Sequence, residues 1–157
     1  MKLKVCGLSN SEGIKTCVRY NVNFCGFILN YSKSHRFISF EKAKKLLDID
    51  KNQTDFVGVL VNPTLEELEK FSKLNLDYFQ LYGQYDNKSL TNIKNRFRKK
   101  IIVTIQVKNK DDIENYKKVE DGADIILWDS SGYEKSLGWK HNWIKDIKTK
   151  KEKMIAG

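Results

Sequence analysis

The stretch FVGVLVNPTLEELEKFSKLNLDYFQLY, residues 56–82, contains one complete unit of the fold. It begins and ends with an apolar run that does not alternate with polar residues, which is typical of strands covered on both faces. Between the runs, Thr64 and Glu67 have the spacing of a capping box at the start of a helix. Apolar side chains then repeat at helical spacing: Leu65, Leu68 and Phe71. The stretch therefore predicts a strand, a helix and a second strand.

The same pattern recurs along the whole chain. Five further apolar runs predict buried strands: LKVC (3–6), FCGFIL (24–29), IIVTI (101–105), DIILW (124–128) and KMIA (153–156). Between the runs, Ser39 can cap a helix in which Ala43, Leu46 and Leu47 share a face. Two more apolar stripes predict helices: Leu90, Ile93 and Phe97, then Ile113, Tyr116 and Val119, with Gly122 as a helix terminus before the next strand. Regular alternation of this kind predicts parallel strands with helical crossovers.

Two architectures satisfy this pattern: an open doubly wound sheet and a closed (βα)8 barrel. Residues 1–157 are enough for a single domain, which we expect here. Five strands with their helices fit an open sheet of about 150 residues, whereas a barrel needs at least about 200. Periodicity and length alone therefore favour the open sheet.

The composition excludes several classes of function. A formal charge of +9 is compatible with nucleic acid or an anionic ligand as a partner. The lysines are spread over nearly every polar stretch instead of forming one basic stripe, so no nucleic-acid partner is expected. Three cysteines without a CxxC pair and two distant histidines suggest neither a disulfide framework nor a metal site. The N-terminus lacks the apolar region of a signal peptide, and no apolar run approaches 18 residues. We therefore expect no membrane partner and a cytoplasmic protein.

Ligands of parallel α/β proteins bind beyond the carboxyl ends of the strands, where three side chains have a functional interpretation. Cys6 is either a small core residue or a general base whose thiol ionises near neutral pH. Asp129 either caps the turn that follows its strand or acts as a general acid kept protonated by apolar surroundings. Arg36 is either a solvated loop residue or a clamp for a carboxylate or phosphate. Nucleotide and metal motifs such as GxGxxG, GxxxxGK[ST] and HExxH do not occur.

Five motifs in order along the chain resemble those of the phosphoribosylanthranilate isomerase family. KVCGLS is similar to the family's KICGIT, YFQLYG to its QLHG, and ILWDSSG to its LLLDS. FCGFIL with SKSHRFIS resembles its second strand and the loop that follows, and FVGVLVN resembles its third strand. The resemblance covers essentially the whole chain. It implies a (βα)8 barrel, here incomplete, with six βα units and the start of the seventh strand, and so reverses the preference for an open sheet.

The resemblance also implies a reaction: the Amadori rearrangement of N-(5'-phosphoribosyl)anthranilate in tryptophan biosynthesis. It implies that Asp129 protonates the ring oxygen, that Cys6 removes the C2' proton and that Arg36 holds the anthranilate carboxylate. The partner is a small phosphorylated substrate. No cofactor and no metal are implied, because every step is a proton transfer.

The sequence departs from the family at two places near the expected site. Tyr82 stands where QLHG has its histidine, and the family's glycine-rich loop after the sixth strand is reduced to Gly132, Gly138 and Trp139. The final residues KMIAG resemble the seventh strand and the first glycine of a phosphate-binding loop. We therefore expect the N-terminal part of such an isomerase, inactive or nearly so by itself. The alternatives are a non-catalytic remnant or partner subunit of the same fold and a basic nucleic-acid-binding α/β domain.

Overall fold

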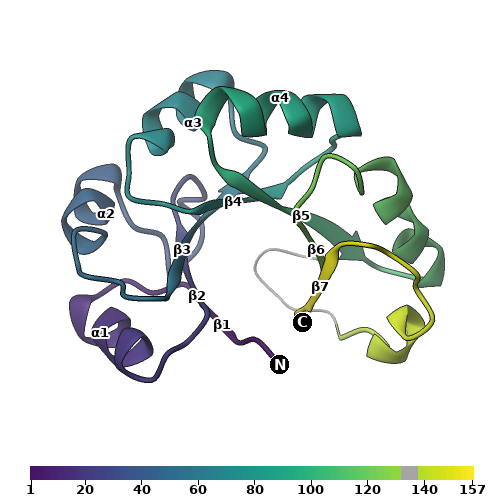
Figure 1. The fold of residues 1–157 in the computed structure, drawn as a ribbon, viewed down its shortest axis with the longest axis horizontal. Helices are drawn as coiled ribbons and strands as arrows, with labels where there is room; N and C mark the ends of the chain where they lie inside the picture. The colour runs from purple at the N-terminus through teal and green to yellow at the C-terminus, as the bar shows by residue number, and fades with distance from the viewer. Residues whose placement is uncertain (132–137) are drawn as a thin grey trace. The chain divides into compact units, whose positions relative to one another are not determined.

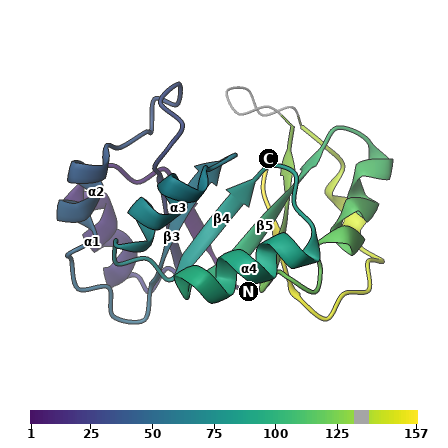
Figure 2. The same cartoon turned by 90° about the horizontal axis from the view of Figure 1, so that it is seen from above.

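The computed structural model describes residues 1–131 and 138–157, which divide into two compact units, Met1–Gln80 and Leu81–Gly157. The first unit contains three strands and three helices, and β4 (Tyr78–Tyr82) runs across the boundary. Its elements are β1 (Lys4–Cys6), α1 (Ser11–Arg19), β2 (Phe24–Ile28), α2 (Phe40–Leu46), β3 (Asp55–Val61) and α3 (Leu65–Ser72). The strands pair in parallel, β1 with β2 and β2 with β3. Within this unit, α1 and α2 lie on the same side of the strands (Figures 1 and 2).

The second unit has the same alternation. Its elements are α4 (Asn87–Phe97), β5 (Lys100–Val107), η1 (Lys110–Lys118), β6 (Ile125–Ser130), η2 (His141–Ile144) and β7 (Glu152–Ile155). Here too β5 pairs in parallel with β6, and β6 with β7. The predicted strands are all found, with ends that differ by two residues at most. The parallel α/β fold expected from the alternation is thus confirmed.

Helix starts follow the predicted caps. Thr64 and Glu67 form the capping box of α3, and the hydroxyl of Ser39 accepts the N–H of Lys42 at the start of α2. One apolar position of the stripe on α3 was assigned wrongly. Leu65 is 52% exposed, because it is the first residue of the helix and lies before the turn that packs on the strands, whereas Leu68 and Phe71 are buried.

The stripe Ile113, Tyr116 and Val119 does not lie on an α-helix. The segment η1 is a 3₁₀ helix that ends at Lys118, so Gly122 does not terminate it. A uniform spacing of three residues matches the three residues per turn of a 3₁₀ helix, and all three side chains are buried. Gly122 instead permits close packing on α4, since a β-carbon there would lie 2.7 Å from Cβ of Leu90.

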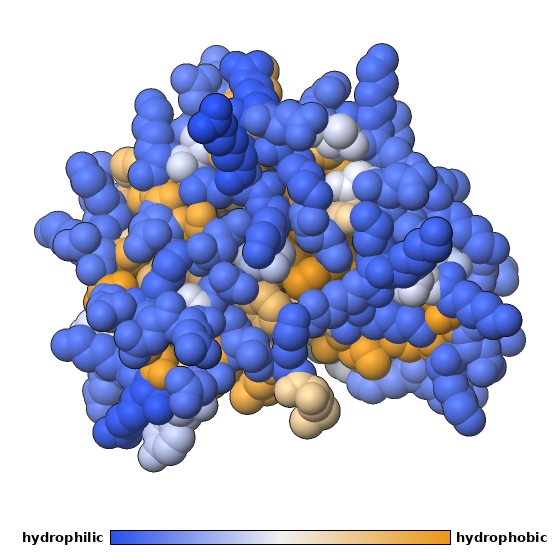
Figure 3. All heavy atoms as spheres, viewed as in Figure 1, coloured by the Kyte–Doolittle hydropathy of each residue, from blue (hydrophilic) through white to orange (hydrophobic). Residues whose placement is uncertain are grey.

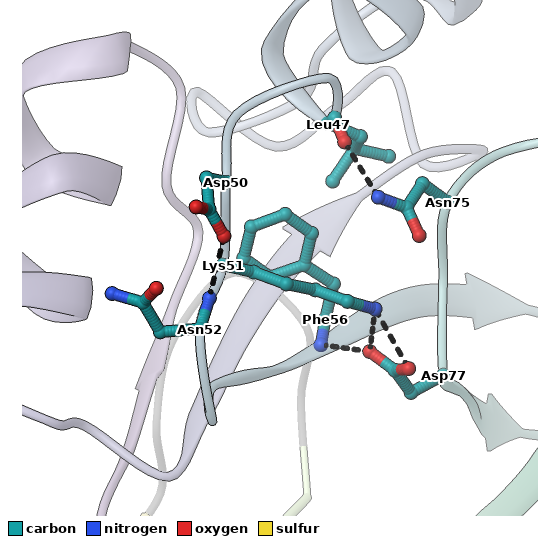
Figure 4. A network of polar contacts seen from close by, with 7 residues as sticks. All are labelled: Leu47, Asp50, Lys51, Asn52, Phe56, Asn75 and Asp77. Carbon is teal, nitrogen blue, oxygen red and sulfur yellow. Dashed lines mark hydrogen bonds and ion pairs between the residues drawn. The ribbon is translucent and has the colours of Figure 1, made fainter.

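The residue just before β2, before β4 and before β6 has a side-chain oxygen that accepts a backbone N–H at the start of the preceding strand. Asn23 Oδ1 accepts the N–H of Leu3 at 2.9 Å, Asp77 Oδ2 that of Phe56 at 2.7 Å, and Asp124 Oδ2 that of Ile101 at 2.8 Å. Lysine ammonium groups pair with both aspartates: Lys51 with Asp77 and Lys94 with Asp124, each at 2.6 Å. Figure 4 shows the Asp77 network, in which the ammonium of Lys51 also lies 5.4 Å from the centre of the Phe56 ring.

Polar side chains dominate the face shown in Figure 3, with apolar ones visible between them. The core lies beneath, in the strands and the helix faces that cover them. The largest fully buried side chains include Trp128, Phe24, Phe27, Phe56 and Phe79.

The Asp77 network predicts a measurable stability loss. Replacing Asp77 with alanine leaves the N–H of Phe56 and the ammonium of Lys51 without their shared acceptor, and should lower the free energy of unfolding by about 2 kcal/mol. Urea denaturation measures the change. Asp77→Asn keeps an acceptor oxygen and should lose less, while the exposed Asp48→Ala should stay within about 0.5 kcal/mol of the parent. Equal effects of Asp77→Ala and Asp48→Ala would contradict the assignment.

Candidate active site

Cys6 ends β1 as a half-buried free thiol. Directly after it, Gly7 adopts a φ of +83°, a conformation that residues with a side chain rarely adopt. The chain turns there, and the N–H groups of Gly7 and Leu8 both donate to the carbonyl of Gly26, at 2.9 and 3.1 Å. The end of β1 is therefore held firmly against β2, with the thiol at the carboxyl edge of the sheet.

Arg36 reaches the same edge from the segment after β2. The N–H of Ile38 donates to the carbonyl of Ile28 at 3.0 Å, which brings that segment back against the strand. Nη1 of Arg36 donates to the carbonyl oxygen of Cys6 at 3.3 Å, and its aliphatic stem lies across Gly7, where any β-carbon would collide with it. The structure thus brings two of the three predicted residues, Cys6 and Arg36, side by side.

The other two thiols are buried, in contrast to Cys6. Cys25 lies on β2 against Cys17 of α1. Burial and the neighbouring Cys17 raise the pKa of Cys25 to about 12, although the ammonium of Lys4 lowers it. Cys25 is therefore neutral at physiological pH and unsuited to act as a base.

Asp129 lies in the second unit, at the next-to-last position of β6, and is half-buried. Its neighbour Trp128 packs on η1, where the indole N–H donates to the carbonyl of Ile113 at 3.2 Å. Because successive side chains of a strand point to opposite faces, Asp129 lies on the face away from η1. Oδ1 of Asp129 accepts the N–H of Ser130, the last residue of the same strand, at 2.8 Å. The alternative role of Asp129, a cap on the turn that follows, extends to Gly132, which lies outside the described residues.

Tyr82 supplies the second contact of Asp129. Its hydroxyl donates to Oδ2 at 2.6 Å, so each carboxyl oxygen of Asp129 accepts a hydrogen bond and the group has a defined orientation. The sequence places Tyr82 at a strand end, where the family has a histidine, but does not predict its partner. A polar residue at the end of β4 was the available signal, but its partner is 47 residues away in sequence.

Further polar side chains share the face of Asp129. Gln106 on β5 pairs with Asp129 in the parallel register, and Thr104 lies two residues earlier on the same face. Among the residues described, the buried hydroxyl of Thr104 has no hydrogen-bond partner. Buried hydroxyls nearly always have one, so Thr104 is an exception on this face of the strand.

The end of β7 is held by residues of the segment before it. The indole N–H of Trp139 donates to the carbonyl of Ala156 at 2.8 Å, and Nε2 of His141 lies 2.8 Å from the carbonyl oxygen of Gly157. Gly157 has a φ of +91° and lies so close to Ser130 that a β-carbon would be 2.6 Å from Cβ of Ser130. Of the three residues that echo the family's glycine-rich loop, Gly132 lies outside the described residues.

Two kinds of feature are not found in the part of the chain that the structure describes. No helix there is long and apolar enough to cross a membrane. No group of three or more His, Cys, Asp or Glu side chains is placed to hold a metal ion.

These observations define a class first: a parallel α/β protein with a thiol, a guanidinium and a carboxyl group at the carboxyl ends of its strands. Comparisons with known proteins narrow the class. The sequence model of N-(5'-phosphoribosyl)anthranilate (PRA) isomerase matches residues 3–157. The chain therefore belongs to the phosphoribosylanthranilate isomerase family.

Individual relatives agree with this assignment. The N-(5'-phosphoribosyl)anthranilate isomerase of Petrotoga mobilis is 34% identical over 165 residues, covering 100% of this chain and 75% of the relative. That of Streptococcus gordonii is 33% identical over 142 residues, covering 88% of this chain and 67% of the relative.

Solved structures agree as well. A crystal structure of phosphoribosyl anthranilate isomerase in complex with reduced 1-(o-carboxyphenylamino)-1-deoxyribulose 5-phosphate is 30% identical, with a TM-score of 0.70, covering 83% of this chain and 65% of that one. The Thermus thermophilus enzyme, 21% identical, shares the fold with a TM-score of 0.77 and covers 92% of this chain and 70% of that one. The chain thus spans roughly two thirds to three quarters of the length of these proteins.

The contact between Tyr82 and Asp129 predicts energetic coupling. Tyr82→Phe removes only the hydroxyl, and should lower the free energy of unfolding by about 1–3 kcal/mol because a half-buried carboxyl oxygen of Asp129 loses its hydrogen bond. In a double-mutant cycle with Asp129→Ala, urea denaturation should show that the two losses are not additive.

Tyr116→Phe is the matched control, since its hydroxyl makes a longer contact of 3.4 Å with the carbonyl of Lys148. Its loss should be smaller and additive with Asp129→Ala. Additive losses for Tyr82→Phe and Asp129→Ala would contradict the coupling.

Proposed function

We propose that residues 1–157 carry the acid–base groups of a cytoplasmic phosphoribosylanthranilate isomerase that acts in tryptophan biosynthesis. The observation that carries the proposal is the pairing of Cys6 with Arg36 at the carboxyl end of β1, in a chain of this family. The substrate is N-(5'-phosphoribosyl)anthranilate. The related crystal structure with a reduced form of the rearranged product supports a ligand of this class.

In the proposed reaction, Asp129 donates its proton to the ring oxygen of the substrate. The C1'–O bond breaks, its electron pair stays on the oxygen, and an iminium forms at C1'. The thiolate of Cys6 then takes the proton at C2', and the electron pair of that C–H bond moves to form an enolamine, which tautomerises to the ketone. Atoms and charges balance within the substrate and these two groups, so no cofactor takes part.

Arg36 has the role of a clamp for the anthranilate carboxylate. Its guanidinium is exposed and makes one backbone contact with Cys6, which leaves further N–H groups to bind an anion. Binding the anthranilate carboxylate there places the ribose of the substrate next to the thiol of Cys6, which removes the C2' proton. Positioning of this kind accounts for a large share of many enzymatic rate enhancements.

We further propose that the strands are the first seven of a (βα)8 barrel, in which six βα units are complete and the seventh strand has begun. Barrels of this type hold a substrate phosphate with the loops after strands seven and eight. Since binding energy from a remote phosphate helps to position the reacting centre, the 157-residue chain alone should turn over slowly. Rapid turnover by this chain would contradict that part of the proposal.

Single-turnover assays, with enzyme in excess of N-(5'-phosphoribosyl)anthranilate, test the acid and the base. Cys6→Ala and Asp129→Ala should each slow the reaction by about 100-fold or more, as is typical for the loss of a general acid or base. The exposed Asp48→Ala should match the parent rate. A near-parental rate for Cys6→Ala would refute the base assignment.

Arg36 is tested by binding rather than by rate. Isothermal titration with reduced 1-(o-carboxyphenylamino)-1-deoxyribulose 5-phosphate should show weaker binding to Arg36→Ala by about tenfold or more, because a charge-assisted contact is lost. Arg19→Ala removes an equal charge from α1 and should bind as the parent does. Equal affinities for Arg36→Ala and the parent would rule out the clamp.

A further inference from the structure

Lys4 lies on the same face of β1 as Cys6, because side chains two residues apart on a strand point the same way. In the parallel register, Cys6 pairs with Gly26 of β2. The adjacent residue Cys25 lies on the other face, against Cys17 of α1. Lys4 and Cys6 therefore occupy the face of these strands that α1 does not cover.

Gly26 leaves the space that these two side chains occupy on its face of the strand. A β-carbon built on Gly26 would lie 2.9 Å from Nζ of Lys4 and 3.0 Å from Sγ of Cys6. The ammonium and the sulfur thus both lie over one glycine. An opposite charge within about 4–6 Å favours the charged form of an ionisable group, and a thiolate is such a form.

The ammonium of Lys4 also acts on the neighbouring thiol. At Cys25, burial and Cys17 raise the pKa to about 12, and the charge of Lys4 opposes them. At Cys25 the effect of burial on the pKa is larger than that of Lys4, because the Cys25 side chain is fully buried. Cys6 is half-buried at the strand end, where Arg36 adds a second positive charge next to its carbonyl.

We propose that Lys4 is a positioning residue of the site, whose ammonium stabilises the thiolate of Cys6. The thiolate is the form that can accept a carbon-bound proton, so the inference deepens the proposed function and rests on it for its catalytic meaning. The thiolate itself can be measured without substrate. Failure of this inference is therefore distinguishable from failure of the proposed isomerase activity.

The test is the rate at which iodoacetamide, a neutral reagent, alkylates Cys6 in the 157-residue chain. Peptide mapping by mass spectrometry follows Cys6 separately from Cys17 and Cys25. Lys4→Met should lower the rate at pH 7 about tenfold, because loss of a nearby positive charge favours the unreactive thiol. At alkaline pH, where the thiol ionises without help, the two rates should converge.

Two further variants separate charge from structure. Lys4→Arg keeps the charge and should restore most of the rate, whereas Lys15→Met on α1 removes an equal charge at an exposed site and should leave the rate unchanged. In denaturant all variants should react alike. The proposal is overturned if Lys4→Met reacts at the parental rate at pH 7, or if Lys4→Arg is as slow as Lys4→Met.

Discussion

A side-chain oxygen on the residue just before β2, β4 and β6 accepts a backbone N–H at the start of the preceding strand, and these contacts help to hold the register on which the site depends. Side chains along a strand alternate between two faces, so a slip of one residue would move every functional group to the wrong face. The contacts lie at the amino edge of the strands, within each unit. They leave the carboxyl edge free for residues selected for chemistry rather than for pairing.

At that free edge, two glycines let charged side chains approach the thiol of Cys6. Gly7 allows the stem of Arg36 to cross the backbone just after Cys6, and Gly26 leaves room for Lys4 beside the sulfur. In the second unit, Tyr82 and the N–H of Ser130 hold both oxygens of Asp129. Each candidate catalytic group is therefore oriented by contacts within its own unit.

The sequence predicted the strands well because buried apolar runs between capped helices leave few alternatives, as residues 56–82 illustrate. It also placed Cys6 and Asp129 at strand ends and Arg36 in the loop after the second strand. Local patterns could not predict contacts between residues distant in sequence, such as the hydroxyl of Tyr82 on Asp129. They also misassigned two residues. Leu65 has helical spacing, but the spacing does not show at which turn the helix begins to pack on the strands. Gly122 is compatible both with a helix terminus and with close packing, and the sequence does not distinguish the two.

We propose that Cys6, with Arg36 beside it, lies in the binding site of the isomerase substrate. The most direct test is the alkylation rate of Cys6 with and without reduced 1-(o-carboxyphenylamino)-1-deoxyribulose 5-phosphate, followed by peptide mapping. The compound should slow alkylation of Cys6 in proportion to occupancy, and Arg36→Ala should need a higher concentration for the same protection. An alkylation rate that stays unchanged up to a large excess of the compound would contradict the proposal.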